Sequence, residues 1–217
     1  MSHTNAAVGV AGIWLAIASA LLVAALIFHG PLAPDFSEQM KRVADGAMGW
    51  SVIHWVSAAS LSLYAVAGLV VLTSGSRLAA GWWTMTAWAI LTVSALWTMT
   101  TAVAEATVVT NAAVSGSKEM FEAWWAFAEG KANGIAFLAL AVAVISGNEA
   151  PSSERAVPAW SAWIALVSGI ASFAGWALGR WFGVDLGNLL WVASSVLMSV
   201  WTLWFGFALM HSRVNVT

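Results

Sequence analysis

The first candidates for chemistry are ionisable side chains that lie inside or at the ends of long apolar runs. Placing a charged side chain at the centre of a bilayer costs at least about 2.5 kcal/mol. Residues kept in spite of that cost are therefore the first candidates for function. In chain order they are His29, His54, Glu105, Glu122, Glu129, Lys131 and Arg180.

Imidazole and carboxylate groups suit Zn, Fe, Mn and Cu ions, so a metal site is the first interpretation. The core of the expected site is His54, Glu105 and Glu129, with His29 and Glu122 next to it. None of these residues stands in a short metal-binding motif such as HExxH. Each ligand would therefore come singly from a separate helix. We predict a His/Glu cluster near one membrane face that binds a transition-metal ion or a small polar ligand.

The same carboxylates also fit a proton-coupled carrier of small solutes. A carboxylate in an apolar setting can load and release protons close to neutrality. Glu105 and Glu129 would carry the proton, His54 would relay it, and Lys131 or Arg180 would supply a counter-charge. A third interpretation is an accessory subunit without chemistry, whose Trp-rich surface docks to a larger membrane complex.

Two further interpretations bear on the histidines. Haem is less expected than a metal ion, because His29 stands at the end of a run and His211 near the opposite face. In a purely structural interpretation, Glu129 pairs with Lys118 or Arg180, and His54 donates to a backbone carbonyl or a serine. Whether the protein is an enzyme stays open.

Composition fixes the class of the protein. Of the 217 residues, 61% are hydrophobic and 8% are charged, and the mean hydropathy is +0.83. The net charge of −2 and the lack of a basic stripe argue against a nucleic-acid partner. The chain has no cysteine, which excludes disulfides, thiolate metal sites and iron–sulfur clusters.

The candidate residues must be positioned by membrane-spanning helices, which need about 20 apolar residues each. We predict an all-α polytopic integral membrane protein, with six transmembrane helices in a single bundle over residues 1–217. The spans are expected at about 8–28, 48–72, 82–106, 121–145, 160–181 and 189–210. An even number of spans puts both termini on one side, here named face A; the cluster lies toward the other side, face B.

The expected surroundings are the lipid bilayer and its surface. Residues 30–49 form the longest predicted loop, and Asp35 or Ser37 can cap a short amphipathic helix over about 35–47 that lies on the membrane surface.

No cleavable signal peptide is evident at the N-terminus, and we expect the protein to lie in the plasma (inner) membrane with cytoplasmic termini. Both a homo-oligomer and a larger membrane complex stay open as assemblies.

Overall fold

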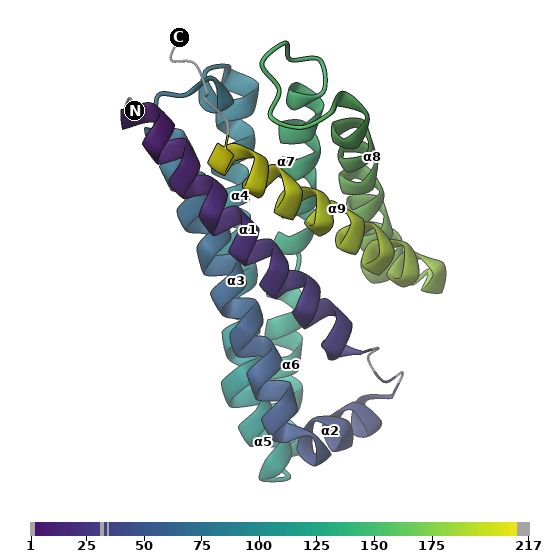
Figure 1. The fold of residues 1–217 in the computed structure, drawn as a ribbon. Coiled ribbons are helices and arrows are strands. Elements are labelled where there is room, and N and C mark those ends of the chain that lie inside the picture. The colour runs from purple at the N-terminus through teal and green to yellow at the C-terminus, as the bar shows by residue number, and fades with distance from the viewer. Residues whose placement is uncertain (1–2, 31–32, 34, 212–217) are drawn as a thin grey trace.

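The computed structural model is all-helical over the residues it describes, which are 3–30, 33 and 35–211 (Figure 1). Two of its helical segments, η2 and η3, are π-helical, and η1 is a short 3-10 helix. The elements are α1 (His3–His29), α2 (Phe36–Asp45), α3 (Ala47–Thr73), η1 (Arg77–Ala79), α4 (Trp82–Ala104), η2 (Glu105–Val109), α5 (Thr110–Val114), α6 (Lys118–Lys131), α7 (Gly134–Glu149), α8 (Ala159–Trp176), η3 (Ala177–Trp181) and α9 (Asp185–His211).

Six helices pack as a closed ring in which each contacts its two neighbours. The order around the ring is α1, α3, α4, α7, α8 and α9, and α9 closes it by packing on α1. Small residues make the closure possible, since a Cβ on Gly12 of α1 would stand 2.6 Å from the Gly206 carbonyl oxygen of α9. Such close backbone approach is how helices associate in lipid, where apolar burial contributes little. In Figure 1, α1 begins and α9 ends at the same end of the bundle, which is face A.

Five helical stretches are long and apolar enough to cross a membrane. They are Ala6–His29, Ala47–Thr73, Trp82–Val114, Ala159–Trp181 and Asp185–His211. The stretch predicted to end at residue 106 continues through η2 and α5 to Val114. The sixth place in the ring belongs to α7, whose 16 residues are fewer than a full crossing needs.

The predicted span 121–145 is two helices in the structure, not one. Helix α6 ends at Lys131, and α7 begins at Gly134 after a turn that contains Asn133. Asn and Gly are weak helix formers, which favours a break here. Gly134 also lets α7 approach α4 closely, because a Cβ there would lie 2.8 Å from the Ser94 carbonyl oxygen.

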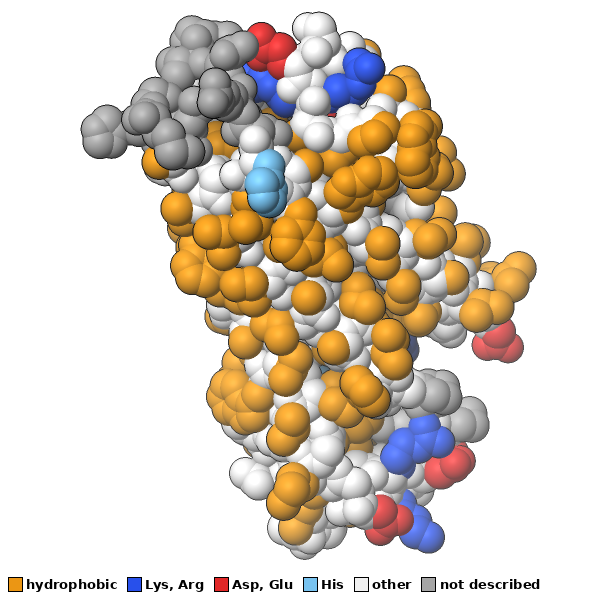
Figure 2. Space-filling view, in the orientation of Figure 1, with side chains coloured by type: hydrophobic (Ala, Val, Ile, Leu, Met, Phe, Trp, Pro, Cys, Tyr) orange, Lys and Arg blue, Asp and Glu red, His pale blue; other side chains and the backbone are white. Residues whose placement is uncertain are grey.

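The outer surface carries many large apolar side chains. Trp163, Val167 and Ile170 of α8 are each about half exposed or more, and Figure 2 shows apolar side chains over most of one face, with Lys, Arg, Asp and Glu gathered toward its ends. Water-soluble proteins rarely expose apolar patches of this extent. The structure is consistent with an integral helical membrane protein.

Helix α2 differs from the expected surface helix in what covers its apolar face. The Asp35 carboxylate caps the helix by accepting from the backbone N–H groups of Ser37 and Glu38. Val43 is fully buried and packs in a second small core with Phe121 of α6 and Val109 of η2. This face of α2 therefore contacts protein where we expected it to contact lipid.

Candidate metal centre

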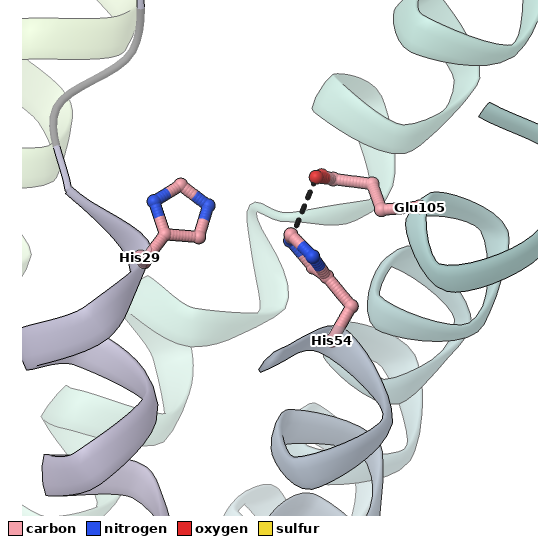
Figure 3. Close-up of side chains that lie close together, drawn as sticks. All are labelled: His29, His54 and Glu105. Carbon is pink, nitrogen blue, oxygen red and sulfur yellow. Dashed lines mark ion pairs between the residues drawn. The ribbon is translucent and has the colours of Figure 1, made fainter. Parts of the chain in front are cut away.

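Three of the predicted site residues come together in the face-B half of the bundle: His29, His54 and Glu105 (Figure 3). One potential ligand atom from each lies within 4.8 Å of the other two. His29 is the last residue of α1, His54 stands two turns into α3, and Glu105 begins η2. The cluster thus draws one side chain from each of three neighbouring helices.

His54 and Glu105 are the most tightly placed pair. The His54 Nε2 atom lies 2.8 Å from Glu105 Oε2, and the two side chains are 6% and 14% exposed. The other ring nitrogen, Nδ1, is 2.8 Å from the Trp50 carbonyl oxygen, one turn earlier in α3. A carbonyl only accepts hydrogen bonds, so Nδ1 must carry the proton there.

His29 repeats this arrangement at the end of α1. Gly30 ends the helix with a φ of +68°, a left-handed conformation that favours glycine. Its carbonyl oxygen lies 2.9 Å from His29 Nδ1, so Nδ1 is again the proton-bearing nitrogen. Figure 3 shows the other ring nitrogen, Nε2, on the side of Glu105 and His54.

Both imidazoles therefore have Nδ1 bound to a backbone carbonyl and Nε2 free to act as a metal ligand. This is the usual arrangement around protein-bound metals, where a second hydrogen bond fixes the ring and its tautomer. Glu105 Oε2 is buried, and its short contact to His54 Nε2 is an ion pair only when His54 carries a second proton. Two lone pairs cannot face each other at this distance, so a metal ion or a proton, carried by His54 or by Glu105, must lie between Nε2 and Oε2.

The spacing is close to that of a metal site. Ligands about 2.0–2.1 Å from a tetrahedral ion stand roughly 3.3 Å from one another. The observed atoms lie between 2.8 Å and 4.8 Å apart. Small side-chain rotations would therefore bring all three to one ion.

The π-helical segment η2 places Glu105. A π-helical turn adds one residue to the helix and often marks a functional site. The Thr110 hydroxyl donates to the Glu105 carbonyl oxygen at 2.7 Å, five residues back, and the Ser51 hydroxyl of α3 donates to the Ala106 carbonyl oxygen at 2.8 Å. The Thr110 bond closes the wide turn within its own helix, and the Ser51 bond holds the start of η2 against the helix that carries His54.

Trp50 packs beside both histidines. Its ring centroid lies 4.9 Å from that of His29 and 4.7 Å from that of His54, and the two imidazole centroids are 5.1 Å apart in an edge-to-face contact. Rings at these distances touch. A porphyrin cannot lie between the imidazoles in this arrangement, so the geometry does not fit bis-histidine haem.

A cavity of about 810 Å³ opens next to the cluster. Its deeper wall includes His29, Glu105 and the buried side chains of Thr98 and Trp176. The exposed residues around its mouth come mainly from η3 and the first turns of α9, among them Trp181 and Asp185. Two of the three cluster residues are thus accessible to a molecule that enters the cavity.

Arg180 and Glu122, the other predicted site residues whose side chains are described, do not join the three-residue cluster. Arg180 lines the cavity in η3, with its guanidinium carbon 5.5 Å from the centre of a Trp176 ring. Glu122 is exposed on α6. The side chains of Glu129 and Lys131 lie outside the described part of the structure.

Asn133 has a role that sequence reasoning did not assign to it. Its Oδ1 atom accepts from the indole N–H groups of Trp176 at 2.9 Å and Trp181 at 3.0 Å. These two hydrogen bonds connect the turn between α6 and α7 to the end of α8 and to η3. A polar residue at a helix break was the only sequence signal for such a contact.

A second buried ionic contact lies at face A and was not predicted. Arg77 of η1 donates to both carboxylate oxygens of Glu149 at 3.0 Å and 3.1 Å. Arg77 also donates to the Glu154 backbone carbonyl, and Glu149 accepts from the Ala156 backbone N–H. The pair joins the loop after α3 to the loop between α7 and α8.

No family model, no curated protein and no solved structure matches this chain.

Proposed function

We propose that the protein is an integral membrane protein that binds a divalent transition-metal ion through His29, His54 and Glu105. The observation that carries this proposal is the convergence of Glu105 with two histidines whose Nδ1 atoms are each held by a backbone carbonyl. That pattern leaves both Nε2 atoms and the carboxylate facing one point. Grouping two Nε2 lone pairs and a carboxylate in an apolar bundle is costly unless a cation lies between them.

The ligand set favours particular ions. Two imidazoles and one carboxylate suit Zn²⁺, Fe²⁺ or Mn²⁺ better than Ca²⁺ or Mg²⁺, which prefer oxygen ligands. Structural zinc sites are closed by four protein ligands, whereas catalytic sites keep a position open. With three protein ligands and a neighbouring cavity, this site belongs to the open kind.

Elemental analysis tests the proposal directly. Protein purified in mild detergent without chelator should hold about one transition-metal ion per chain, as a three-ligand site predicts. His54→Gln should lose that metal. His211→Gln is the matched control, because His211 has the same Nδ1 contact to the Phe207 carbonyl oxygen but belongs to no cluster among the described residues.

The competing explanation is a plain ion pair between a doubly protonated His54 and Glu105. It predicts protein that stays metal-free after incubation with Zn²⁺, Fe²⁺ or Mn²⁺ and removal of the excess. Metal bound equally by wild type and His54→Gln would place the ion elsewhere. Either result contradicts the proposal.

A proton-coupled carrier is the second candidate. The cavity ends at Glu105, and the fourth predicted span is broken at Lys131–Gly134, as helices are at many transporter binding sites. A carrier must open this cavity alternately to both faces. A Thr98→Cys variant should then react with an impermeant maleimide from either side of the membrane, whereas a fixed metal site predicts labelling from one side only.

The cysteine-free sequence also gives a clean test of orientation, for which we propose cytoplasmic termini in the plasma membrane. Ser152→Cys places one thiol in the loop between α7 and α8 at face A, and Ser117→Cys places one at face B. In intact cells, the impermeant reagent should label only Ser117→Cys. Protein purified from these cells in mild detergent would also reveal any partner subunit that copurifies.

A further inference from the structure

The cavity beside the cluster is larger than a metal ion and its water require. A bound water occupies about 30 Å³, while pockets for organic ligands measure about 300–1,000 Å³. At about 810 Å³ the cavity falls in the second range. The unexplained space is therefore of the size that holds an organic molecule.

The walls of this cavity are unusually rich in indole rings. Trp125 of α6 lines it together with Trp176, Trp181 and Trp191 from α8, η3 and α9. Trp176 and Trp191 meet edge to face, with their ring centroids 4.9 Å apart. Flat rings attract flat partners through offset and edge-to-face contacts, so these walls favour a planar ligand over a flexible chain.

The hydrogen-bonding groups of these indoles are unequally used. Trp176 and Trp181 both donate to Asn133, so their N–H groups are taken. The Trp191 N–H is buried and has no hydrogen-bond partner among the described residues. Its nitrogen is not exposed to the cavity, as is also true of the unpaired Trp50 and Trp201 nitrogens, so these indoles offer a ligand apolar ring surface and no free donor.

The metal ligands face the same space. His29 and Glu105 line the cavity, whereas His54 supports the cluster from outside it. An ion held by these three residues would thus present its open coordination position to the cavity. A ligand placed there needs an oxygen donor at one end.

We propose that the cavity binds a planar aromatic molecule carrying an oxygen ligand, such as a carboxylate or hydroxamate group. The oxygen group completes the coordination of the metal beside Glu105 and His29. The ring lies among the indoles and is held there by ring-to-ring contacts. This inference rests on the proposed metal site and names the class of molecule that the site takes.

The test uses Co²⁺ as the metal, because its visible absorption bands change when a new ligand joins the coordination sphere. Two probes share one metal-binding group, and only one of them has a ring: benzohydroxamate and acetohydroxamate. Both should shift the bands, and benzohydroxamate should do so at roughly ten-fold lower concentration because its ring packs on the indoles. Cobalt content measured after gel filtration shows that neither probe has removed the metal.

Trp191→Leu should abolish the preference for benzohydroxamate while leaving Co²⁺ bound. Trp204→Leu, an exposed tryptophan further along α9, is the matched control and should keep the preference. If Trp191→Leu fails to fold, Trp191→Phe keeps a smaller aromatic ring and should show an intermediate preference.

The outcomes separate the two proposals. Wild-type protein that binds no metal overturns the proposed function, and this inference with it. If the Co²⁺ absorption bands of metal-loaded protein change with neither hydroxamate, the inference alone is overturned. Equal response to the two probes, or an unchanged preference in both Trp191 variants, also overturns it, since the indoles would then play no part in binding.

Discussion

Among the described residues, each face of the bundle holds one carboxylate that is mostly shielded from solvent, and the two have different partners. At face A, Glu149 is 2% exposed and accepts two hydrogen bonds from Arg77 and one from the Ala156 backbone N–H. At face B, Glu105 lies 2.8 Å from the Nε2 atom of His54, an imidazole that carries a charge only when it is doubly protonated. The first carboxylate is paired with a side chain that is always charged, and the second with one that is not.

The two carboxylates also differ in their positions in the fold. Arg77 begins η1 and Glu149 ends α7, where the pair joins two connections at the end of the bundle. Glu105 lies at a π-helical turn beside a cavity, with two imidazoles turned toward it. Breaking a buried carboxylate–guanidinium pair is costly, whereas a carboxylate beside two neutral imidazoles can be balanced by a bound cation. The comparison assigns stability to face A and binding to face B.

The largest expected effect comes from breaking the face-A pair. Arg77→Met leaves the Glu149 carboxylate buried without its cation, which should lower the free energy of unfolding by about 3–5 kcal/mol. Thermal unfolding in detergent, followed by circular dichroism, measures this loss. The metal content of the protein that remains folded should be unchanged.

Arg155→Met is the control for that substitution. Arg155 is exposed, and its guanidinium donates to the Ser152 backbone carbonyl oxygen at 3.1 Å. Its loss should change stability by less than about 1 kcal/mol, as for other surface charges. Equal effects of the two substitutions would show that the face-A pair contributes no more than a surface contact.

The face-B cluster should respond in the opposite way. His54→Gln removes a direct ligand, and changes to residues that merely orient ligands already cost about 10–100-fold in metal affinity. We therefore expect the affinity for Zn²⁺ to fall by more than about 100-fold in a chelator competition assay. The glutamine amide can still donate to Glu105, so stability without metal should fall by only about 1 kcal/mol.

A loss of stability as large as that of Arg77→Met would contradict this separation. So would an unchanged affinity for Zn²⁺. The first result would make His54–Glu105 a structural pair like Arg77–Glu149, and the second would place the metal elsewhere.

Much of the helical arrangement could be predicted from the sequence, because apolar runs of about 20 residues have few alternatives to membrane-spanning helices. Five of the predicted runs are continuous helices long enough to cross. The run over 121–145 is broken instead, because packing of Gly134 on α4 and the Asn133 bonds to two indoles favour a break. Hydropathy averages over a window and does not register such local contacts.

The candidate site was only partly predictable. Residue type and depth singled out His29, His54 and Glu105, but their convergence depends on the order of helices around the ring. Glu149 was overlooked because it stands at the end of an apolar run, where a solvated side chain is the usual expectation. Its partner Arg77 lies 72 positions away in the sequence, and no local pattern connects the two.

The smallest expected effect comes from loosening the π-helical turn that positions Glu105. Thr110→Val removes the hydroxyl that donates to the Glu105 carbonyl oxygen five residues back. A single hydrogen bond contributes about 0.5–1.5 kcal/mol, so the turn should relax toward an ordinary helix and shift Glu105. We expect the affinity for Zn²⁺ to fall by roughly 3–10-fold, the equivalent of that energy.

Thr107→Val is the matched control, because Thr107 donates to the Val103 carbonyl oxygen four residues back, as threonine commonly does in an α-helix. Equal loss of affinity in both variants would mean that threonine hydroxyls stabilise this helix generally, and that the π-helical turn does not position the ligand.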